Sequence, residues 1–257
     1  MDINLMVLNV GNTRTAVGVF VAGALEHVAR VPHEEKERWP EVIREAWGKI
    51  AGLDSPAVAG ASVNPAVMEA LEHAVQRETG AKVEWVGREI ELPIRVLTDP
   101  PSETGVDRIV TVAAAYEQLG KACVVVDAGT ALTVDACNDK GEFLGGAIAP
   151  GAAMQLRALN EYTAKLPLVA LEVPKGVFGR NTTEAIRHGV YQGLRGAVKE
   201  LLENFATELG FWPEAIATGG DAAKLFDGWE LVHAISPDLT LYGIALSYAN
   251  HHIKHGT

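Results

Sequence analysis

The sequence predicts an α/β protein built from two similar domains that face each other across a cleft. Short apolar runs of strand length alternate with longer segments of helical periodicity along the whole chain. At 257 residues the chain can hold one large domain or two small ones, each able to bury a core. One unusual hairpin occurs twice, half a chain apart, and this repeat favours two domains.

The second copy of the hairpin follows the apolar run Ala122–Val126, which ends on Asp127, Gly129 and Thr130. Alternating residues then lead to a polar turn that ends at Gly141. Glycine lets the backbone approach a ligand closely, because it has no Cβ. Backbone N–H groups beside a hydroxyl suit phosphate oxygens, and a carboxylate suits the accompanying cation. Alone, this turn is equally compatible with an ordinary tight hairpin and a capping Asp.

The first copy begins with the apolar run at residues 5–8, which ends on Asn9, Gly11 and Thr13. A Gly turn follows at Gly23, as far from Asn9 as Gly141 is from Asp127. The repetition favours a pair of phosphate-binding hairpins over two ordinary turns. Neither G-x-G-x-x-G nor G-x-x-x-x-G-K-[ST] occurs, so nucleotide binding through those two loops is excluded.

The composition limits the classes of function. The formal net charge of −11 argues against binding to duplex nucleic acid, although small anionic ligands stay possible. Cys123 and Cys137 both fall in predicted strands, where small buried hydrophobes in a reducing compartment are expected rather than a disulfide or a metal pair. No apolar run approaches membrane-spanning length, and no basic region leads to a cleavage site at the N-terminus. We therefore expect a cytoplasmic protein without a membrane partner.

The remaining elements follow from apolar periodicity, caps and turn residues. The stretch from Gly145 to Gly151 is interpreted as irregular backbone. Strands are predicted at 15–21, 25–31, 57–63, 83–86, 214–217 and 230–234, and helices at 39–52, 65–80, 109–119, 153–162, 182–210 and 239–252. Residues 91–103 are rich in Pro and polar side chains and are predicted to form a loop over the cleft.

Three features have more than one interpretation at this point. Asp107 and Arg108 precede the helix at 109–119, where a dipole partner and a solvated charge are favoured over a catalytic pair. Glycines inside the long helix imply close packing of another helix, from this chain or from a partner. The C-terminal histidines could bind metal, but a solvated terminus is favoured. These residues are Gly189, Gly193 and Gly196 of the long helix, and His251, His252 and His255 of the tail.

Six segments, in this order, resemble the signatures of the type III pantothenate kinases, a family of the acetate and sugar kinase, heat-shock-70 and actin superfamily. They are Asn9–Thr13, Gly105–Arg108, Asp127–Thr130, Gly145–Gly151, Gly179–Thr182 and Thr218–Gly220. The resemblance runs nearly from end to end. It implies two ribonuclease-H-like (actin-like ATPase) domains, residues 1–118 and 119–257, facing each other across a nucleotide cleft.

The resemblance also implies a function: ATP-dependent phosphorylation of pantothenate to 4'-phosphopantothenate, the first step of coenzyme A biosynthesis. It implies Mg²⁺ carried with ATP, a monovalent cation (K⁺ or NH₄⁺) and a homodimer. Asp107 would be the general base, and Asp127 would help to bind the monovalent cation. Gly105, Val106, Asp107 and Arg108 would hold pantothenate, together with Thr182 of the neighbouring subunit. The ATP phosphates would be held by Asn9, Val10, Gly11, Asn12, Thr13, Arg14, Thr15, Gly129 and Thr130.

This sequence departs from the family pattern at several positions. The first hairpin begins with Asn9 where the family normally has Asp, so this position brings no negative charge to a divalent cation. Thr111 stands near a place where the family often has Asn, and the loop before Gly105 lacks an aromatic residue to line the pantothenate pocket. Besides an active pantothenate kinase, two alternatives therefore stay open: a silent homologue with a binding or regulatory role, and a kinase for another small hydroxyl compound.

Overall fold

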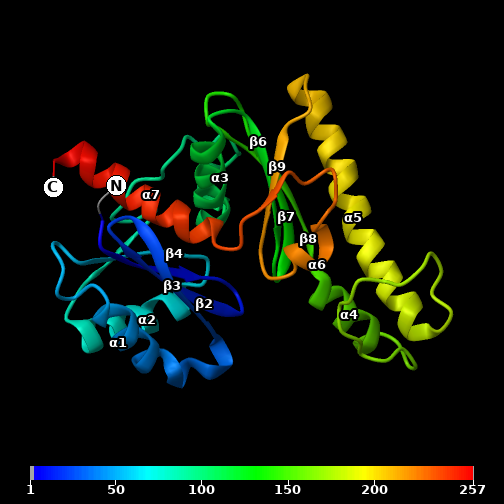
Figure 1. Ribbon diagram of the computed structural model, residues 1–257, viewed down its shortest axis with the longest axis horizontal. Coiled ribbons are helices and arrows are strands. Elements are labelled where there is room, and N and C mark those ends of the chain that lie inside the picture. The colour runs from blue at the N-terminus through cyan, green and yellow to red at the C-terminus, as the bar shows by residue number, and fades with distance from the viewer. Residues whose placement is uncertain (1–2, 257) are drawn as a thin grey trace. The chain divides into compact units, whose positions relative to one another are not determined.

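The computed structural model describes residues 3–256, and the chain forms two compact units (Figure 1). Unit 1 comprises Met1–Arg95, Asp99–Ala114 and Thr240–Thr257, and unit 2 comprises Val96–Thr98 and Ala115–Leu239. Met1, Asp2 and Thr257, which the predicted domains include, lie outside the described residues. The domain limits 1–118 and 119–257 remain a proposal, and the contacts place the C-terminal segment with the first unit.

Unit 1 is built on a five-stranded mixed sheet with the order β3-β2-β1-β4-β5. Its first three strands form an antiparallel meander, and β4 and β5 add in parallel beyond β1. The predicted strands are confirmed, with bounds Leu5–Val10 (β1), Arg14–Val21 (β2), Ala24–Pro32 (β3), Ala57–Ser62 (β4) and Val83–Trp85 (β5). The carboxyl ends of the parallel strands β1 and β4 therefore meet at one edge of this sheet.

Helices cover both faces of the first sheet. Helices α1 (Trp39–Gly48) and α2 (Pro65–Thr79) pack with β1, β2 and β4 in one apolar core (Figure 1). Helix α2 is capped at both ends, because Asn64 Oδ1 accepts from the Val67 N–H at 3.3 Å and Gly80 ends the helix with a φ of 73°. A second core on the other face contains Val110 of α3 (Val106–Leu119) and apolar residues of α7 (Leu239–His255). Short 3₁₀ segments lie at His33–Arg38 and Pro101–Glu103.

Unit 2 repeats the plan with a second five-stranded mixed sheet, β10-β9-β6-β7-β8. Its strands are Cys123–Ala128 (β6), Ala131–Cys137 (β7), Phe143–Pro150 (β8), Glu214–Thr218 (β9) and Ala234–Ile235 (β10). Helices α4 (Ala152–Glu161), α5 (Thr182–Leu209) and α6 (Ala222–Phe226) share one apolar core with this sheet. The two similar α/β units expected from the repeated hairpin are thus present.

Several elements differ from the sequence prediction, among them helix α1, which ends at Gly48 rather than at Gly52. The stretch predicted to be irregular is strand β8, because Gly145, with a φ of 113°, and a shift in register near Cys137 let it pair along β7. The strand predicted at 230–234 is reduced to β10, because successive turns close at Trp229 and Val232. Helix α3 begins at Val106, three residues earlier than predicted. This earlier start places Asp107 inside the helix.

The two cysteines are buried in strands, as predicted. Cys123 and Cys137 are free, buried and directly opposite each other on β6 and β7. Their sulfur atoms are 3.4 Å apart, in the range of an S–H···S contact.

Candidate active site

The first hairpin connects β1 to β2 and has an exposed tip. The Gly11 N–H donates to the Arg14 carbonyl at 3.1 Å, which closes the loop, while Asn12, Thr13 and Arg14 are exposed. At its base, the Val63 N–H donates to the Val10 carbonyl at 3.1 Å. The hairpin therefore stands at the carboxyl edge of β1 and β4, a usual location for ligands in open α/β sheets.

Asn9 carries an unsatisfied buried oxygen at this edge. Its Oδ1 atom is shielded from solvent and has no hydrogen-bond partner among residues 3–256. A buried polar atom without a partner is costly, so it usually has a ligand, a water or an ion to bind. An amide oxygen is a neutral ligand for a hard cation, and it equally accepts a hydrogen bond from a bound group.

A histidine that the sequence analysis did not select supports this hairpin. The His33 N–H donates to the Thr13 carbonyl at 2.9 Å, and His33 Nε2 lies 3.3 Å from the buried Thr15 Oγ1. The antiparallel register of β2 with β3, with Thr15 opposite Val31, brings His33 to this place. No local sequence signal marks it, because its position depends on how two strands pair.

Asp107 lies at the same edge of unit 1. A Cβ atom on Gly105 would fall 3.5 Å from a Val63 methyl carbon and 2.7 Å from Asp107 Oδ1, so Gly105 packs closely against the end of β4 and against the Asp107 carboxylate. Asp107 Oδ1 accepts from the Arg108 N–H at 2.8 Å. Burial raises the pKa of Asp107 above its ordinary value, and the N–H group and charge of Arg108 oppose this rise. A carboxylate with a raised pKa suits a general base that works near neutral pH.

The second hairpin is shorter and is packed on two sides. The Gly129 N–H donates to the Ala131 carbonyl at 3.0 Å, so the loop has one residue fewer than the first. A Cβ on Gly151 would fall 2.5 Å from the Thr130 carbonyl oxygen, and one on Gly219 would fall 2.5 Å from the Ala128 carbonyl oxygen. Segments around residues 128, 151 and 219 therefore converge on Asp127 and Thr130, and only glycine fits at the two contact points.

The contacts of Gly219 explain why the last signature of unit 2, Thr218–Gly219–Gly220, needs a glycine at its centre. Gly219 has a φ of 91°, a conformation that favours glycine, and it lies against the Asp127 carboxylate. The Asp221 N–H then donates to the Ala128 carbonyl at 3.0 Å. The Thr218–Gly219–Gly220 turn is therefore part of the Asp127 hairpin environment rather than a separate loop.

Thr182 lies on another element of unit 2, in the exposed first turn of α5. Asn181 caps this helix: its Oδ1 accepts from the Glu184 N–H at 2.9 Å, and Glu184 Oε2 accepts from the Arg180 N–H at 2.7 Å. Thr182 thus lies in a well-capped first helical turn.

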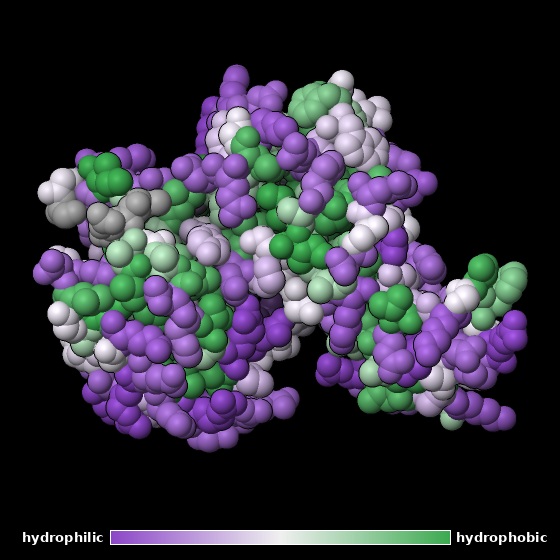
Figure 2. All heavy atoms as spheres, viewed as in Figure 1, coloured by the Kyte–Doolittle hydropathy of each residue, from purple (hydrophilic) through white to green (hydrophobic). Residues whose placement is uncertain are grey.

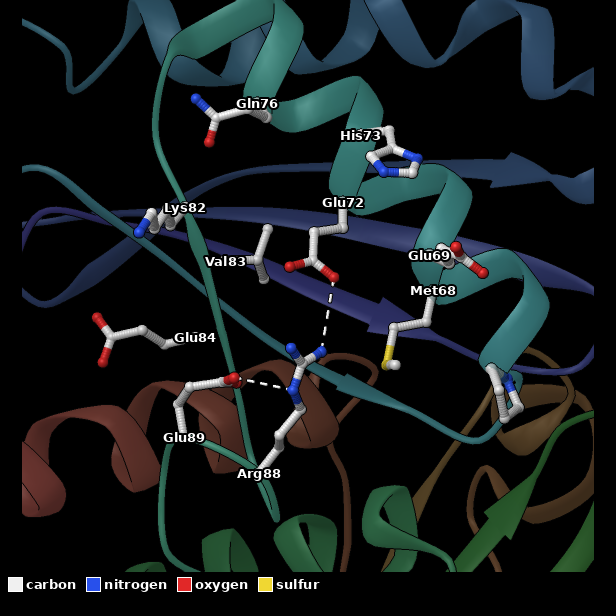
Figure 3. A pocket seen from close by; sticks show the side chains of 11 residues that line it. Met68, Glu69, Glu72, His73, Gln76, Lys82, Val83, Glu84, Arg88 and Glu89 are labelled. Atoms are coloured by element: carbon white, nitrogen blue, oxygen red, sulfur yellow. Dashed lines mark ion pairs between the residues drawn. The ribbon is translucent and has the colours of Figure 1, made fainter.

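A cavity of about 830 Å³ between α2 and β5 contains none of the predicted site residues (Figure 3). Arg88 crosses it and pairs with Glu72 at 3.6 Å and Glu89 at 2.9 Å. Four glutamates, a lysine, a histidine and Met68 make up much of the rest of its lining. The glutamates of this lining outnumber Lys82 and Arg88, so the groove has an excess of negative charge and is not suited to bind an anion.

Metal binding by the C-terminal histidines is not supported. Among the described residues, no three His, Cys, Asp or Glu side chains gather in a way that could hold a metal ion. His252 instead pairs with Glu84 at 3.0 Å. Within residues 3–256, no helix has the length and apolar character needed to cross a membrane.

Solved structures place the fold among the actin-like ATPases. MreB 5 of Spiroplasma citri, solved with AMPPNP, superposes with a TM-score of 0.52 over 100% of both chains at 13% identity. A Campylobacter jejuni protein, provisionally described as a Baf family transcriptional activator, superposes with a TM-score of 0.63 at 20% identity and covers 95% of this chain and 98% of its own. At these identities the likeness shows the fold alone.

The sequence comparison is more specific. The pattern of the family described as type III pantothenate kinase matches residues 5–204. The type III pantothenate kinase of Anaeromyxobacter sp. is 37% identical over 248 residues, covering 94% of this chain and 97% of the relative. The chain belongs to the type III pantothenate kinase family. Its function is that of a phosphotransferase that uses ATP to phosphorylate pantothenate in coenzyme A biosynthesis.

Proposed function

We propose that Asp107 is the general base of pantothenate phosphorylation. It would take the proton of the pantothenate hydroxyl as that oxygen attacks the γ-phosphorus of ATP. The observation that carries this role is a partly buried carboxylate with a raised pKa in the first turn of α3, at the carboxyl edge of the first sheet. Phosphoryl transfer depends mainly on positioning and charge neutralisation, and a positioned base adds about 10²–10⁴-fold in rate.

The phosphates of ATP would be held by backbone N–H groups and hydroxyls of the hairpins. In unit 1 these are Asn9, Val10, Gly11, Asn12, Thr13, Arg14 and Thr15, and in unit 2 they are Gly129 and Thr130. The exposed tip of the first hairpin and the lack of a Cβ at Gly129 in the second support this assignment. Arg14 would add a positive charge beside the phosphates.

The cations would be bound by oxygen ligands. The buried, unpartnered Asn9 Oδ1 fits a hard cation or a group bound to it, and the Asp127 carboxylate fits the monovalent cation K⁺ or NH₄⁺. When bound, Mg²⁺ and the monovalent cation supply positive charge that offsets the charge of the transferring phosphoryl group. The role of the protein is to present these oxygens beside the glycine turns.

Pantothenate would lie against Gly105, Val106 and Arg108, with Arg108 a partner for its polar end. Thr182 would reach it from the neighbouring subunit of a homodimer. The glycines of α5 support the dimer, because an added Cβ on Gly189, Gly193 or Gly196 would meet nothing within 4 Å beyond the backbone of its own helix. The loop between α4 and α5 also exposes apolar residues (Figure 2), among them Val177 and Phe178, which are 82% and 79% exposed. We place the enzyme in the cytoplasm.

The test of the base is Asp107→Asn in an assay that couples ADP release to pantothenate addition. We expect turnover to fall by about 10²–10⁴-fold. Because burial raises the pKa of Asp107 in the folded state, wild-type stability should fall as pH rises from the ordinary Asp value through the raised one. The amide introduced by this substitution does not titrate, so the variant should be at least as stable as wild type at pH 7. Turnover at the wild-type rate would remove Asp107 as the base.

Asn9 is the observation behind a second candidate function, that of a silent regulatory relative. No turnover by the wild type, with turnover by Asn9→Asp, would favour this candidate. Turnover only with a different small alcohol would favour a kinase of altered specificity. Turnover with pantothenate, Mg²⁺ and K⁺ excludes both.

The dimer is tested by sedimentation of Gly193→Glu. A glutamate fits the open space over Gly193 in a single chain, but it would prevent close approach of a second helix. We expect the variant to sediment as a folded monomer with a raised KM for pantothenate. Gln192→Glu adds the same charge at the exposed neighbouring position and should leave the dimer intact. A monomeric wild type would contradict the dimer.

A further inference from the structure

The first turn of α3, which carries Asp107, is tied to a helix from the far end of the sequence. Thr111 Oγ1 lies 2.6 Å from the Asp107 carbonyl oxygen and 2.9 Å from Thr240 Oγ1. Thr240 is in the first turn of α7, 129 residues further along the chain. Thr111 is 3% exposed, so water does not compete freely for these bonds.

The direction of each of these two hydrogen bonds follows from which groups can donate a hydrogen. The Thr111 hydroxyl has one hydrogen, and the Asp107 carbonyl can only accept, so that hydrogen goes to Asp107. Thr111 can then only accept from Thr240. The order is Thr240 O–H to Thr111 Oγ1, and Thr111 O–H to the carbonyl of Asp107, with each hydroxyl in a fixed orientation.

A second contact holds the same two helices together. A Cβ on Gly243 would overlap the Val110 carbonyl group, at 2.5 Å from its carbon. Backbone therefore meets backbone at this point, one turn of α7 beyond Thr240. Leu241 and Ile244 pack with Val110 in one apolar core, which fixes the remaining freedom of α7 against α3.

We propose that Thr240 is a positioning residue for Asp107, acting through the hydroxyl of Thr111. The proposal rests on the role of Asp107 proposed above. A base must lie within hydrogen-bond reach of the hydroxyl it deprotonates, and small displacements of a reacting group reduce rates strongly. Through Thr111, Thr240 fixes the position of the Asp107 peptide group in α3. The packing of α7 thereby determines the position of the Asp107 carboxylate.

The test compares Thr240→Val, which keeps the shape and removes the hydroxyl, with Thr240→Ser, which keeps the hydroxyl. For Thr240→Val we expect kcat to fall by about 5–10-fold, the loss typical of one neutral hydrogen bond, with KM for ATP unchanged. Thr240→Ser should restore kcat. Ser247→Ala is the matched control, because Ser247 is also buried on α7 but donates only within that helix, to the Gly243 carbonyl at 2.7 Å. It should leave kcat unchanged.

A second measurement is independent of turnover. Amide hydrogen exchange of residues 107–111 should quicken in Thr240→Val and stay as in wild type in Thr240→Ser and Ser247→Ala. Wild-type exchange and wild-type kcat in Thr240→Val would overturn the proposal, and so would an equal loss of kcat in Ser247→Ala. A wild type without pantothenate turnover would instead overturn the function proposed for Asp107, and the exchange rates would still decide whether Thr240 positions its peptide.

Discussion

The two hairpins have the same place in their units but are held differently. In unit 1, a Cβ added to Gly11 would lie 3.4 Å from its nearest neighbour, the Arg14 carbonyl oxygen. Three residues at the tip of this hairpin are exposed. In unit 2, the shorter loop lies between Gly151 and Gly219 with no room for a Cβ on either. The first hairpin begins with a neutral amide and the second with a carboxylate. Repeated motifs of equal spacing can thus differ in rigidity and in charge.

This difference bears on what each hairpin can contribute. A rigid carboxylate in unit 2 is suited to a fixed cation site. An exposed loop above an unpartnered amide oxygen in unit 1 is suited to a ligand that arrives with its own cation, as ATP does. Three predictions test the contrast.

The largest effect is expected from glycine replacement. Gly219→Ala places a side chain at a φ of 91° and against the Ala128 carbonyl, so we expect a loss of about 3 kcal/mol or more in the free energy of unfolding. Gly11→Ala meets only ordinary contact and should change it by less than about 1 kcal/mol. Urea denaturation measures both. Equal losses would show that the two hairpins are equally constrained.

A smaller effect is expected from Asp127→Asn. Removing the charge from a partly buried site should weaken activation by K⁺ by about 100-fold, since a charge pair at 4 Å is worth several kcal/mol at the effective dielectric of such sites. The measurement is turnover against K⁺ concentration at saturating ATP and Mg²⁺. An unchanged K⁺ dependence would place the monovalent cation elsewhere.

The smallest effect is expected from Asn9→Asp. The added charge should raise the apparent affinity for Mg²⁺ by only about fivefold, because the cost of burying the carboxylate offsets most of its attraction for the cation. Without ligands the new carboxylate would be buried and unpaired, so thermal stability should fall and should recover with Mg²⁺ and ATP. An Asn9→Leu variant separates the charge from the loss of the oxygen. If the thermal stability of Asn9→Asp does not change when Mg²⁺ is added, Asn9 does not face the cation.

Local signals predicted most of the fold. Strands with clear alternation, helix caps such as Asn64 and Asn181, and glycines that end helices all lie where short-range chemistry requires them. The errors occurred in segments whose conformation depends on the pairing of strands. Strand β8 contains Gly145 and Gly146, which indicated irregular backbone, yet it pairs along β7. Gly146 lies where a Cβ would overlap the backbone of Val134, so its absence of a side chain serves the pairing.

Equal spacing in the sequence also concealed a difference. Asn9 pairs with Ala16, whereas Asp127 pairs with Thr133, so the second turn is one residue shorter. The common distance is restored further along, because Gly23 lies two residues after β2 ends at Val21, whereas Gly141 lies four residues after β7 ends at Cys137. Where a strand ends depends on its partner strand, which a pattern along one segment does not contain.

The sequence alone determined the α/β class, the doubled hairpin, the helix ends and the family, because each depends on residues close together in the chain or on their order. Tertiary structure decided which distant residues meet. His33 reaches Thr15 through strand register, Gly151 and Gly219 enclose the second hairpin, and Thr240 meets Thr111 across 129 residues. These contacts arise from the burial of several elements at once, so no single stretch of sequence carries them.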